Sequence, residues 1–342
     1  MSATSRCVSR STSAPQGDAP PLTDPLPTAI PGKATVPRVL VVFFDGVGIG
    51  EPDPEINPFF RAELPVLSGA LGGLLPTLAD LAPFGLAGRT LPLDACLGVP
   101  GTPQSGTGQV ALLTGRNAAE ILGRHFGPWP PVRLRPLLEE ENFLRRAVQL
   151  GGDVAFANAY PEGYPGDRPA RRVAAPPIAA RAAGVLEREH RALAEGRAVA
   201  SEIVNDGWIE FLGHAEIPRV TPEEAGANLA KLAGGADLTF FAHYQTDLAG
   251  HRGGMDGAIA ALERVDRFLG GLLAHLPSDL LVLVSSDHGN LEDIRGGHTR
   301  NPALGLALGP HAATVPPLHS ILGLAEFVLA QVEARVGAMG GG

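Results

Sequence analysis

Five short apolar runs recur along the chain, each of about the length of a β-strand. The first occupies residues 39–44 and is followed directly by Asp45 and a glycine-rich stretch. Because no polar residues alternate with the apolar ones, such a run predicts a strand that is buried on both faces of a sheet. The other four runs occupy residues 154–157, 238–241, 280–284 and 304–308.

Helical patterns lie between several of these runs, at residues 137–150, 222–232 and 258–276. Buried strands that alternate with helices predict an α/β fold, with a mostly parallel central sheet flanked by helices. In sheets of this kind, ligands gather at the carboxyl ends of the strands. We therefore expect functional polar residues directly after the apolar runs.

Two segments depart from this alternation. Residues 1–36 are rich in Ser, Thr, Pro and Ala and lack apolar periodicity, which predicts a disordered tail. Residues 160–220 combine turn formers with an Ala- and Arg-rich stretch, which predicts a small cap inserted into the core. The core is then expected to consist of residues 37–159 and 221–342.

The composition limits the kinds of ligand and compartment. The net charge of −9 argues against nucleic acid as a partner. The two cysteines, Cys7 and Cys96, exclude a disulfide framework and a cysteine-based zinc site, so any metal would be held by Asp, Glu or His. No apolar run has the length of a membrane span and no secretory signal is recognisable, so we expect a cytoplasmic protein without a membrane partner.

Polar residues do follow the predicted strands, and six of them are candidate metal ligands. They are Asp45, Asp247, His251, Asp287, His288 and His298. Taken singly, each has an ordinary explanation as a turn residue, a helix cap or a solvated loop histidine. Together, three carboxylates and three histidines at one sheet edge match the needs of two divalent cations. Mixed shells of this kind suit Zn²⁺ or Mn²⁺ better than Ca²⁺ or Mg²⁺.

Ser105 is the candidate nucleophile. It lies among turn formers at the start of a helical stretch, where its hydroxyl would be near the positive end of the helix dipole. An ordinary N-cap serine would have the same sequence setting. A metal bound to the hydroxyl would favour the alkoxide near neutral pH and turn a poor nucleophile into a good one.

The motifs also have a familiar order and spacing. They are Phe44-Asp45-Gly46-Val47-Gly48-Ile49-Gly50-Glu51, Ser105-Gly106-Thr107-Gly108 with Gly115-Arg116, Asp247-Leu248-Ala249-Gly250-His251, Asp287-His288-Gly289-Asn290 and His298-Thr299-Arg300-Asn301-Pro302. This set resembles the alkaline phosphatase superfamily of metalloenzymes, in particular its branch containing cofactor-independent phosphoglycerate mutase and phosphopentomutase. The resemblance covers most of residues 38–159 and 221–310.

The resemblance implies an alkaline-phosphatase-like core with two divalent metal ions, Mn²⁺ or Zn²⁺. By analogy, Asp247, His251 and His298 would bind one ion. The other would be bound by Asp45, Asp287, His288 and the Ser105 hydroxyl. The implied partner is a small phosphorylated substrate whose phosphoryl group is transferred to Ser105.

Three departures from the mutase pattern keep several functions open. Gln109 stands where the mutase nucleophile motif ends in His, no lysine is placed to clamp a phosphate, and the inserted region is short. The first hypothesis is a phosphomutase or phosphomonoesterase that forms a phosphoserine. The second is a phosphodiesterase, nucleotide pyrophosphatase or phosphonate hydrolase, and the third is a non-catalytic binding protein on the same fold.

Arginines and one histidine are candidates for substrate contacts, because Arg holds phosphate in a bidentate fork. For each of them a solvated surface position is the ordinary alternative. The candidates are Arg116, Arg124 and His125, followed by Arg168, Arg171 and Arg172.

Overall fold

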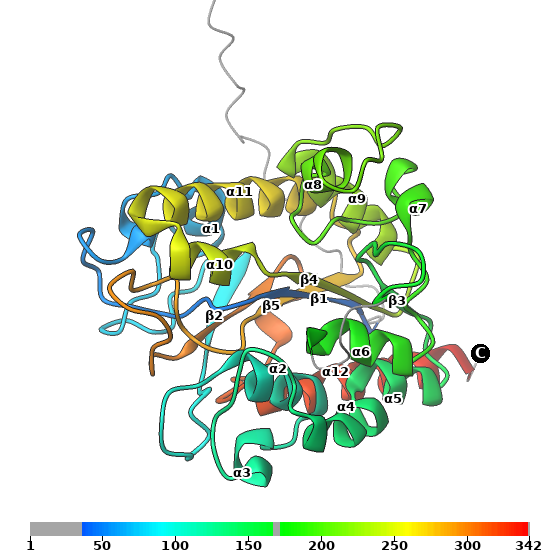
Figure 1. The fold of residues 1–342 in the computed structure, drawn as a ribbon, viewed down its shortest axis with the longest axis horizontal. Coiled ribbons are helices and arrows are strands. Elements are labelled where there is room, and N and C mark those ends of the chain that lie inside the picture. Colours follow the sequence, from blue (N-terminus) through cyan, green and yellow to red (C-terminus); the bar gives the residue numbers. More distant parts are fainter. Residues whose placement is uncertain (1–35, 167–171, 341–342) are drawn as a thin grey trace, which may run out of the picture. The chain divides into compact units, whose positions relative to one another are not determined.

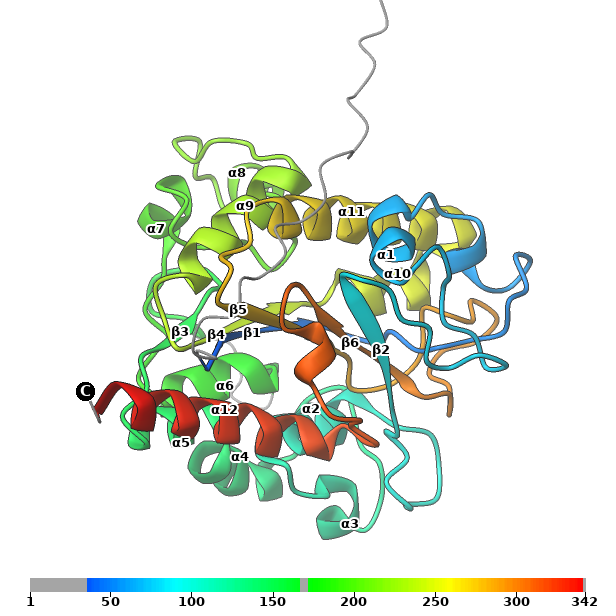
Figure 2. The same cartoon turned by 180° about the vertical axis from the view of Figure 1, so that it is seen from behind.

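A six-stranded sheet lies between two layers of helices in the computed structural model, which describes residues 36–166 and 172–340 (Figures 1 and 2). The strands are β1 (Arg38–Phe44), β2 (Gly88–Leu93), β3 (Val154–Phe156), β4 (Leu238–His243), β5 (Leu280–Ser285) and β6 (Ala303–Leu308). The predicted N-terminal tail lies, except for Val36, outside the described residues, and so do Arg168 and Arg171.

The strand order is β2-β6-β5-β1-β4-β3. Strand β1 pairs in parallel with β4 and β5, and β3 pairs in parallel with β4. Strand β6 is antiparallel to both β5 and β2. The predicted α/β fold with a mostly parallel sheet is therefore confirmed. Strand β2 was not predicted, because Pro92 interrupts a short run that lies at the edge of the sheet.

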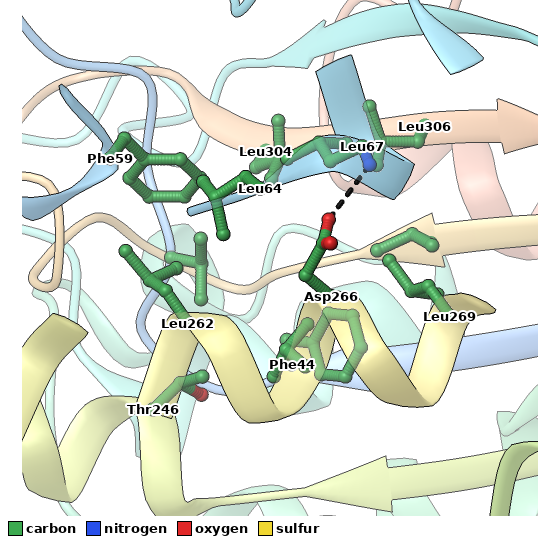
Figure 3. Close-up of a pocket in the computed structure, with 13 residues that line it drawn as sticks. Phe44, Phe59, Leu64, Leu67, Thr246, Leu262, Asp266, Leu269, Leu304 and Leu306 are labelled. Atoms are coloured by element: carbon green, nitrogen blue, oxygen red, sulfur yellow. Dashed lines mark hydrogen bonds between the residues drawn. The ribbon is translucent and has the colours of Figure 1, made fainter. Parts of the chain in front are cut away.

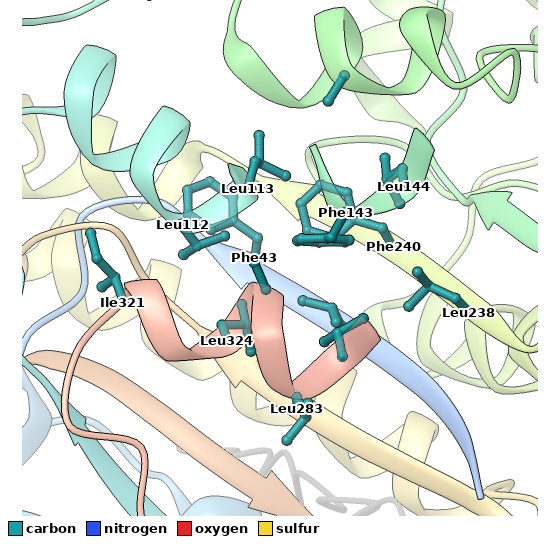
Figure 4. Packing of buried hydrophobic residues seen from close by; sticks show 14 of the residues in the cluster. Phe43, Leu112, Leu113, Phe143, Leu144, Leu238, Phe240, Leu283, Ile321 and Leu324 are labelled. Atoms are coloured by element: carbon teal, nitrogen blue, oxygen red, sulfur yellow. The ribbon is translucent and has the colours of Figure 1, made fainter. Parts of the chain in front are cut away.

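Strand β1 contributes to the core on both sides of the sheet. Val41 and Phe43 belong to one buried apolar cluster, whereas Leu40 and Val42 belong to the other. Figure 4 shows Phe43 packed among residues of α2 and α12. Burial on both faces is the physical reason that this strand is apolar throughout.

The helices of one layer are α1 (Pro65–Ala70), α9 (Pro222–Ala233), α10 (Gln245–Arg252) and α11 (Gly254–Ala274) (Figure 1). The other layer contains α2 (Ser105–Thr114), α4 (Arg135–Glu141), α5 (Phe143–Gln149), α6 (Ala175–Ala182) and α12 (Leu322–Gly340). Shorter helices are α3 (Ala118–Leu122), α7 (His190–Ala194), α8 (Asp206–Glu210) and the 3-10 turns Pro58–Phe60, Val132–Leu134 and Ala312–Thr314. Within the described ranges, no helix is long and apolar enough to cross a membrane.

The helix predicted at residues 137–150 is interrupted at Asn142. The buried Asn142 side chain accepts a hydrogen bond from Arg145 N at 3.0 Å and so caps α5. Its amide donates to Leu138 O at 2.8 Å, near the end of α4. An asparagine that serves both helix ends in this way replaces one long helix by two short ones.

The cap predicted over residues 160–220 stays a proposal. The packing indicates that only part of this segment is separate from the main core. Ala175 and Ala179 of α6 belong to the main core on one side of the sheet. By contrast, Leu193, Trp208 and Ile217 form a separate small apolar cluster. We propose that the separable unit begins after α6.

Helices α9 and α11 pack so closely that glycine is required between them. A Cβ atom at Gly226 would lie 2.1 Å from the carbonyl oxygen of Phe268, and one at Gly271 would lie 2.0 Å from that of Glu223. We expect Gly226→Ala to destabilise the protein by about 1–3 kcal/mol through overpacking. Gly257→Ala, in α11, should stabilise it by about 0.5–1 kcal/mol, because a Cβ there would meet no described atom outside its own helix within 4 Å. Urea unfolding of both variants measures the difference, and equal effects would contradict this packing.

Candidate metal centre

The carboxyl ends of three adjacent strands bring the predicted ligands together. Asp45 directly follows β1, and Asp287 and His288 follow β5. Strand β4, on the other side of β1, leads into α10, which carries Asp247 and His251. These are the positions at which ligands are expected in a parallel sheet.

One group of polar atoms converges on His288. Its Nε2 atom lies 3.5 Å from Asp45 Oδ1 and 3.6 Å from Asp287 Oδ2. The Oγ atom of Ser105 lies 2.9 Å from the same nitrogen. All four side chains are buried, and the two carboxylate oxygens have no hydrogen-bond partner among the residues that the structure describes.

Each of the two aspartates uses only one oxygen within the protein. Asp45 Oδ2 accepts a hydrogen bond from Gln109 Nε2 at 3.0 Å, and Asp287 Oδ1 accepts one from Gly46 N at 3.3 Å. The free oxygens, Asp45 Oδ1 and Asp287 Oδ2, both face His288. Buried polar atoms are normally satisfied, so this pair needs a partner that the described residues do not supply.

The electrostatics of this group favour a cation. Burial, followed by the charges of Asp287 and Asp247, raises the pKa of Asp45 well above its usual value. Burial also raises the pKa of Asp287, although His288 opposes the rise. Burial lowers the pKa of His288 and so favours its neutral, metal-binding form. A divalent cation would compensate both carboxylates at once.

A second group of polar atoms lies nearer the surface. Asp247 Oδ1 lies 3.5 Å from His251 Nε2 and 3.6 Å from His298 Nε2, and the two imidazole nitrogens are 2.9 Å apart. Burial alone would raise the pKa of Asp247, but the hydrogen bond from His298 and the charges of nearby histidines lower it. Burial alone would lower the pKa of His298, yet its contact with Asp247 raises it. These three residues form the half-exposed counterpart of the buried group.

The histidine rings are oriented as metal ligands usually are. The Nδ1 atom of His288 lies 3.3 Å from the carbonyl oxygen of Gly289, and that of His298 lies 3.0 Å from the carbonyl oxygen of Pro103. A carbonyl oxygen only accepts, so each Nδ1 carries a proton, and in the neutral imidazole Nε2 then presents a lone pair to a metal ion. Backbone acceptors of this kind fix the tautomer and orientation of metal-bound histidines. The donor set therefore fits two divalent cations.

Ser105 lies in the first turn of α2, and the N-cap of that helix is Gln104. Its hydroxyl is directed at His288, so it does not cap the helix. Two glycines allow this close approach. A Cβ at Gly106 would lie 2.3 Å from the carbonyl oxygen of Trp129, and one at Gly108 would lie 2.8 Å from that of Asp287.

The residues predicted to contact substrate interact with other groups of the protein in this structure. Arg116 is exposed and forms an ion pair with Glu141 at 2.9 Å. The guanidinium of Arg124 lies 5.7 Å from the centre of the Phe126 ring. The Nε2 atom of His125 lies 3.3 Å from the carbonyl oxygen of Val99. Their roles, and that of the exposed Arg172, stay predictions.

An enclosed cavity near these groups is not suited to a polar substrate. Its volume is about 20 Å³, enough for one water molecule at most. Figure 3 shows its apolar walls, formed by Phe44, Phe59 and leucines of α1 and α11, with Asp266 at one side. The Asp266 carboxylate accepts a hydrogen bond from Leu67 N at 2.7 Å and so serves the start of α1.

Sequence reasoning missed one buried carboxylate beside the site. Glu292 is only 1% exposed and accepts hydrogen bonds from the loop after β1 and from two segments of its own loop, between β5 and β6. It lies five residues after Asp287, in a loop with no periodicity that would indicate burial. Gln109 was noted only as a departure from the mutase motif, and the structure shows it bonded to Asp45.

Comparison with known proteins finds similarity over part of the chain. The family model described as Metalloenzyme superfamily matches residues 222–334. The chain is 41% identical over 75 residues to 2,3-bisphosphoglycerate-independent phosphoglycerate mutase from Wolinella succinogenes, covering 22% of this chain and 15% of the mutase. It is 35% identical over 111 residues to the protein of the same name from Dinoroseobacter shibae, covering 29% of this chain and 22% of that protein. The matched part thus spans less than a quarter of the length of either relative.

A solved structure shares the fold. The PH0037 protein from Pyrococcus horikoshii aligns with a TM-score of 0.53 and 14% identity, covering 87% of this chain and 97% of that chain. The resemblance that the motifs indicated is confirmed. Residues 222–334 are thus similar to the Metalloenzyme superfamily, and part of the chain is similar to the 2,3-bisphosphoglycerate-independent phosphoglycerate mutases.

Proposed function

We propose that this protein is a two-metal phosphoryl-transfer enzyme with Ser105 as its nucleophile. The observation that carries the proposal is the convergence of the Ser105 hydroxyl, His288 Nε2 and two unpartnered carboxylate oxygens in a buried position. A serine that served only as a helix cap would not need this surrounding. The match to a metalloenzyme family supports the same conclusion.

The residues present fit two cations. We assign Asp247, His251 and His298 to the outer ion, because their donor atoms lie within 3.6 Å of one another. Asp45, Asp287, His288 and Ser105 would hold the inner ion. Carboxylate and imidazole donors without Cys suit Zn²⁺ or Mn²⁺. When bound, such ions lower the pKa of a coordinated hydroxyl and neutralise charge on a transferring phosphoryl group.

Few side chains of the protein are then needed to transfer the phosphoryl group to Ser105. The Ser105 hydroxyl releases its proton to solvent and its oxygen attacks phosphorus in line, while the bond from phosphorus to the leaving oxygen breaks and the leaving oxygen takes up a proton from solvent. The position of Ser105 in the first turn of α2 directs backbone N–H groups and the positive end of the helix toward the developing charge. Rigid packing of Gly106 and Gly108 keeps the nucleophile in place before substrate arrives. The product of this step is a phosphoserine.

The second half of the reaction decides between two activities. Attack by water on the phosphoserine makes the protein a phosphomonoesterase, and attack by another hydroxyl of the bound substrate makes it a phosphomutase. The curated relatives favour a phosphomutase. The exposure of the His251 side chain, 39%, favours access of water and so a phosphomonoesterase. In either case we propose a small phosphorylated metabolite as the substrate.

Metal binding should stabilise the fold. Saturating Mn²⁺ or Zn²⁺ at about 100 times the dissociation constant adds about 2.7 kcal/mol to the free energy of unfolding. We expect Asp287→Asn to raise the melting temperature of the metal-free protein, because it removes one of two adjacent buried carboxylates, and to abolish the part of the stabilisation by metal that the inner ion supplies. Differential scanning calorimetry with and without metal measures both effects. Stabilisation by metal that is equal in the variant and the wild type would contradict the assignment of Asp287.

The phosphoserine should be trapped on Ser105. After the metal-loaded protein is incubated with a sugar-phosphate mixture and quenched in acid, we expect intact mass to show one added phosphoryl group and peptide mapping to place it on Ser105. Ser105→Ala should acquire none. Ser68→Ala, whose hydroxyl bonds to Leu64 O in α1, should behave as the wild type. A protein that stays unmodified and prefers aryl phosphodiesters over monoesters would favour the phosphodiesterase hypothesis instead.

A further inference from the structure

We propose that Glu292 is a positioning residue that fixes the metal-binding segments relative to one another. This inference rests on the proposed two-metal function. Among the described residues, Glu292 belongs to neither cluster of converging donor atoms, so it is not proposed as a ligand. Its carboxylate instead joins three chain segments, each of which carries a proposed ligand.

Both carboxylate oxygens of Glu292 are fully used. Oε2 accepts hydrogen bonds from Gly48 N at 2.9 Å and from Asn290 N at 2.8 Å. Oε1 accepts from the Thr299 hydroxyl and from Asn301 Nδ2, the latter at 3.1 Å. Four donors from three segments thus meet on one side chain.

Each donor lies close in sequence to a proposed ligand. Gly48 is three residues after Asp45, Asn290 is two residues after His288, and Thr299 directly follows His298. A short backbone bridge between Gly289 and Thr299 supports the last two segments but does not reach the first. Backbone hydrogen bonds from Leu291 N to Gly46 O and from Ile49 N to Pro302 O, both of 2.9 Å, also join the loop of Asp45 to the residues around these segments. The Glu292 carboxylate adds side-chain contacts to all three segments at once.

Three glycines make room for this carboxylate. A Cβ atom would lie 2.5 Å from Glu292 Cδ at Gly48, 2.9 Å from its Cγ at Gly50 and 2.3 Å from its Oε1 at Gly289. None of the three has a positive φ angle. Glycine is thus required at these positions for space and not for backbone conformation.

Burial of this carboxylate indicates a specific role. Among the described residues, no Lys, Arg or His lies within ion-pair distance of Glu292, so hydrogen bonds alone compensate its burial. Residues that orient metal ligands typically change metal affinity by 10- to 100-fold when they are replaced. An apolar side chain would fill the space without ordering the four donors.

Two variants and one control test the inference. Glu292→Gln keeps the shape but leaves only one oxygen to accept hydrogen bonds, so two of the four donors lose their acceptor. Thr299→Val removes a single donor, next to His298, at similar volume. Asp266→Asn is the matched control, because Asp266 is also a buried carboxylate that accepts two backbone N–H bonds but lies in α11 beside the apolar cavity (Figure 3).

The measurement is calorimetric titration of each metal-free protein with Mn²⁺, together with thermal unfolding of the metal-free forms. We expect Glu292→Gln to weaken Mn²⁺ binding about 10- to 100-fold. Thr299→Val should weaken mainly the ion held by Asp247, His251 and His298. In the double variant, Thr299→Val should have a smaller effect than it has alone, because both changes remove the same hydrogen bond. Asp266→Asn should lower the melting temperature and leave Mn²⁺ affinity unchanged.

Each other outcome has a defined meaning. Wild-type affinity in Glu292→Gln, or an equal loss of affinity in Asp266→Asn, would overturn the positioning role while leaving the two-metal proposal intact. If Glu292→Gln does not fold, unchanged affinity in Thr299→Val would overturn it. A wild-type protein that binds no Mn²⁺ would instead contradict the proposed function itself.

Discussion

Burial of two aspartates beside each other is the constraint on which the rest of the site depends. Asp45 and Asp287 each give one oxygen to a hydrogen bond and leave the other buried without a partner. Burial and neighbouring carboxylate charges raise the pKa of both. Such an arrangement costs free energy unless cations compensate it. Metal ions in this position would therefore contribute to stability as well as to chemistry.

The fold places these residues without long connecting segments. Parallel pairing of β1 with β5 and β4 aligns the carboxyl ends of the three strands, so residues distant in sequence meet at one edge. Helix α2 approaches from the other helical layer and brings Ser105 to His288. Glycines at positions 106 and 108 permit contact between backbones there, and the glycines around Glu292 do the same for the loops.

Much of this arrangement could be predicted because local sequence patterns indicate it. The strands β1, β4 and β5 are continuous apolar runs buried on both faces, and the candidate ligands follow them directly. Other features depend on contacts that no local pattern reveals. Helix α12 has no strongly polar face, β2 contains Pro92, and Asn142 divides a helix through its side chain. In the sequence Glu292 has the setting of a surface glutamate. In the fold it is buried against Gly48 and Gly289.

The most direct test of the account is anomalous diffraction from crystals grown with Mn²⁺ or Zn²⁺, recorded above and below the absorption edge of the metal. The account predicts two separate peaks, one between Asp45, Asp287 and His288 and the other between Asp247, His251 and His298. The Ser105 oxygen should lie within bonding distance of the first peak. Absence of both peaks in crystals that contain the metal, or peaks only at other places on the protein, would contradict the central claim.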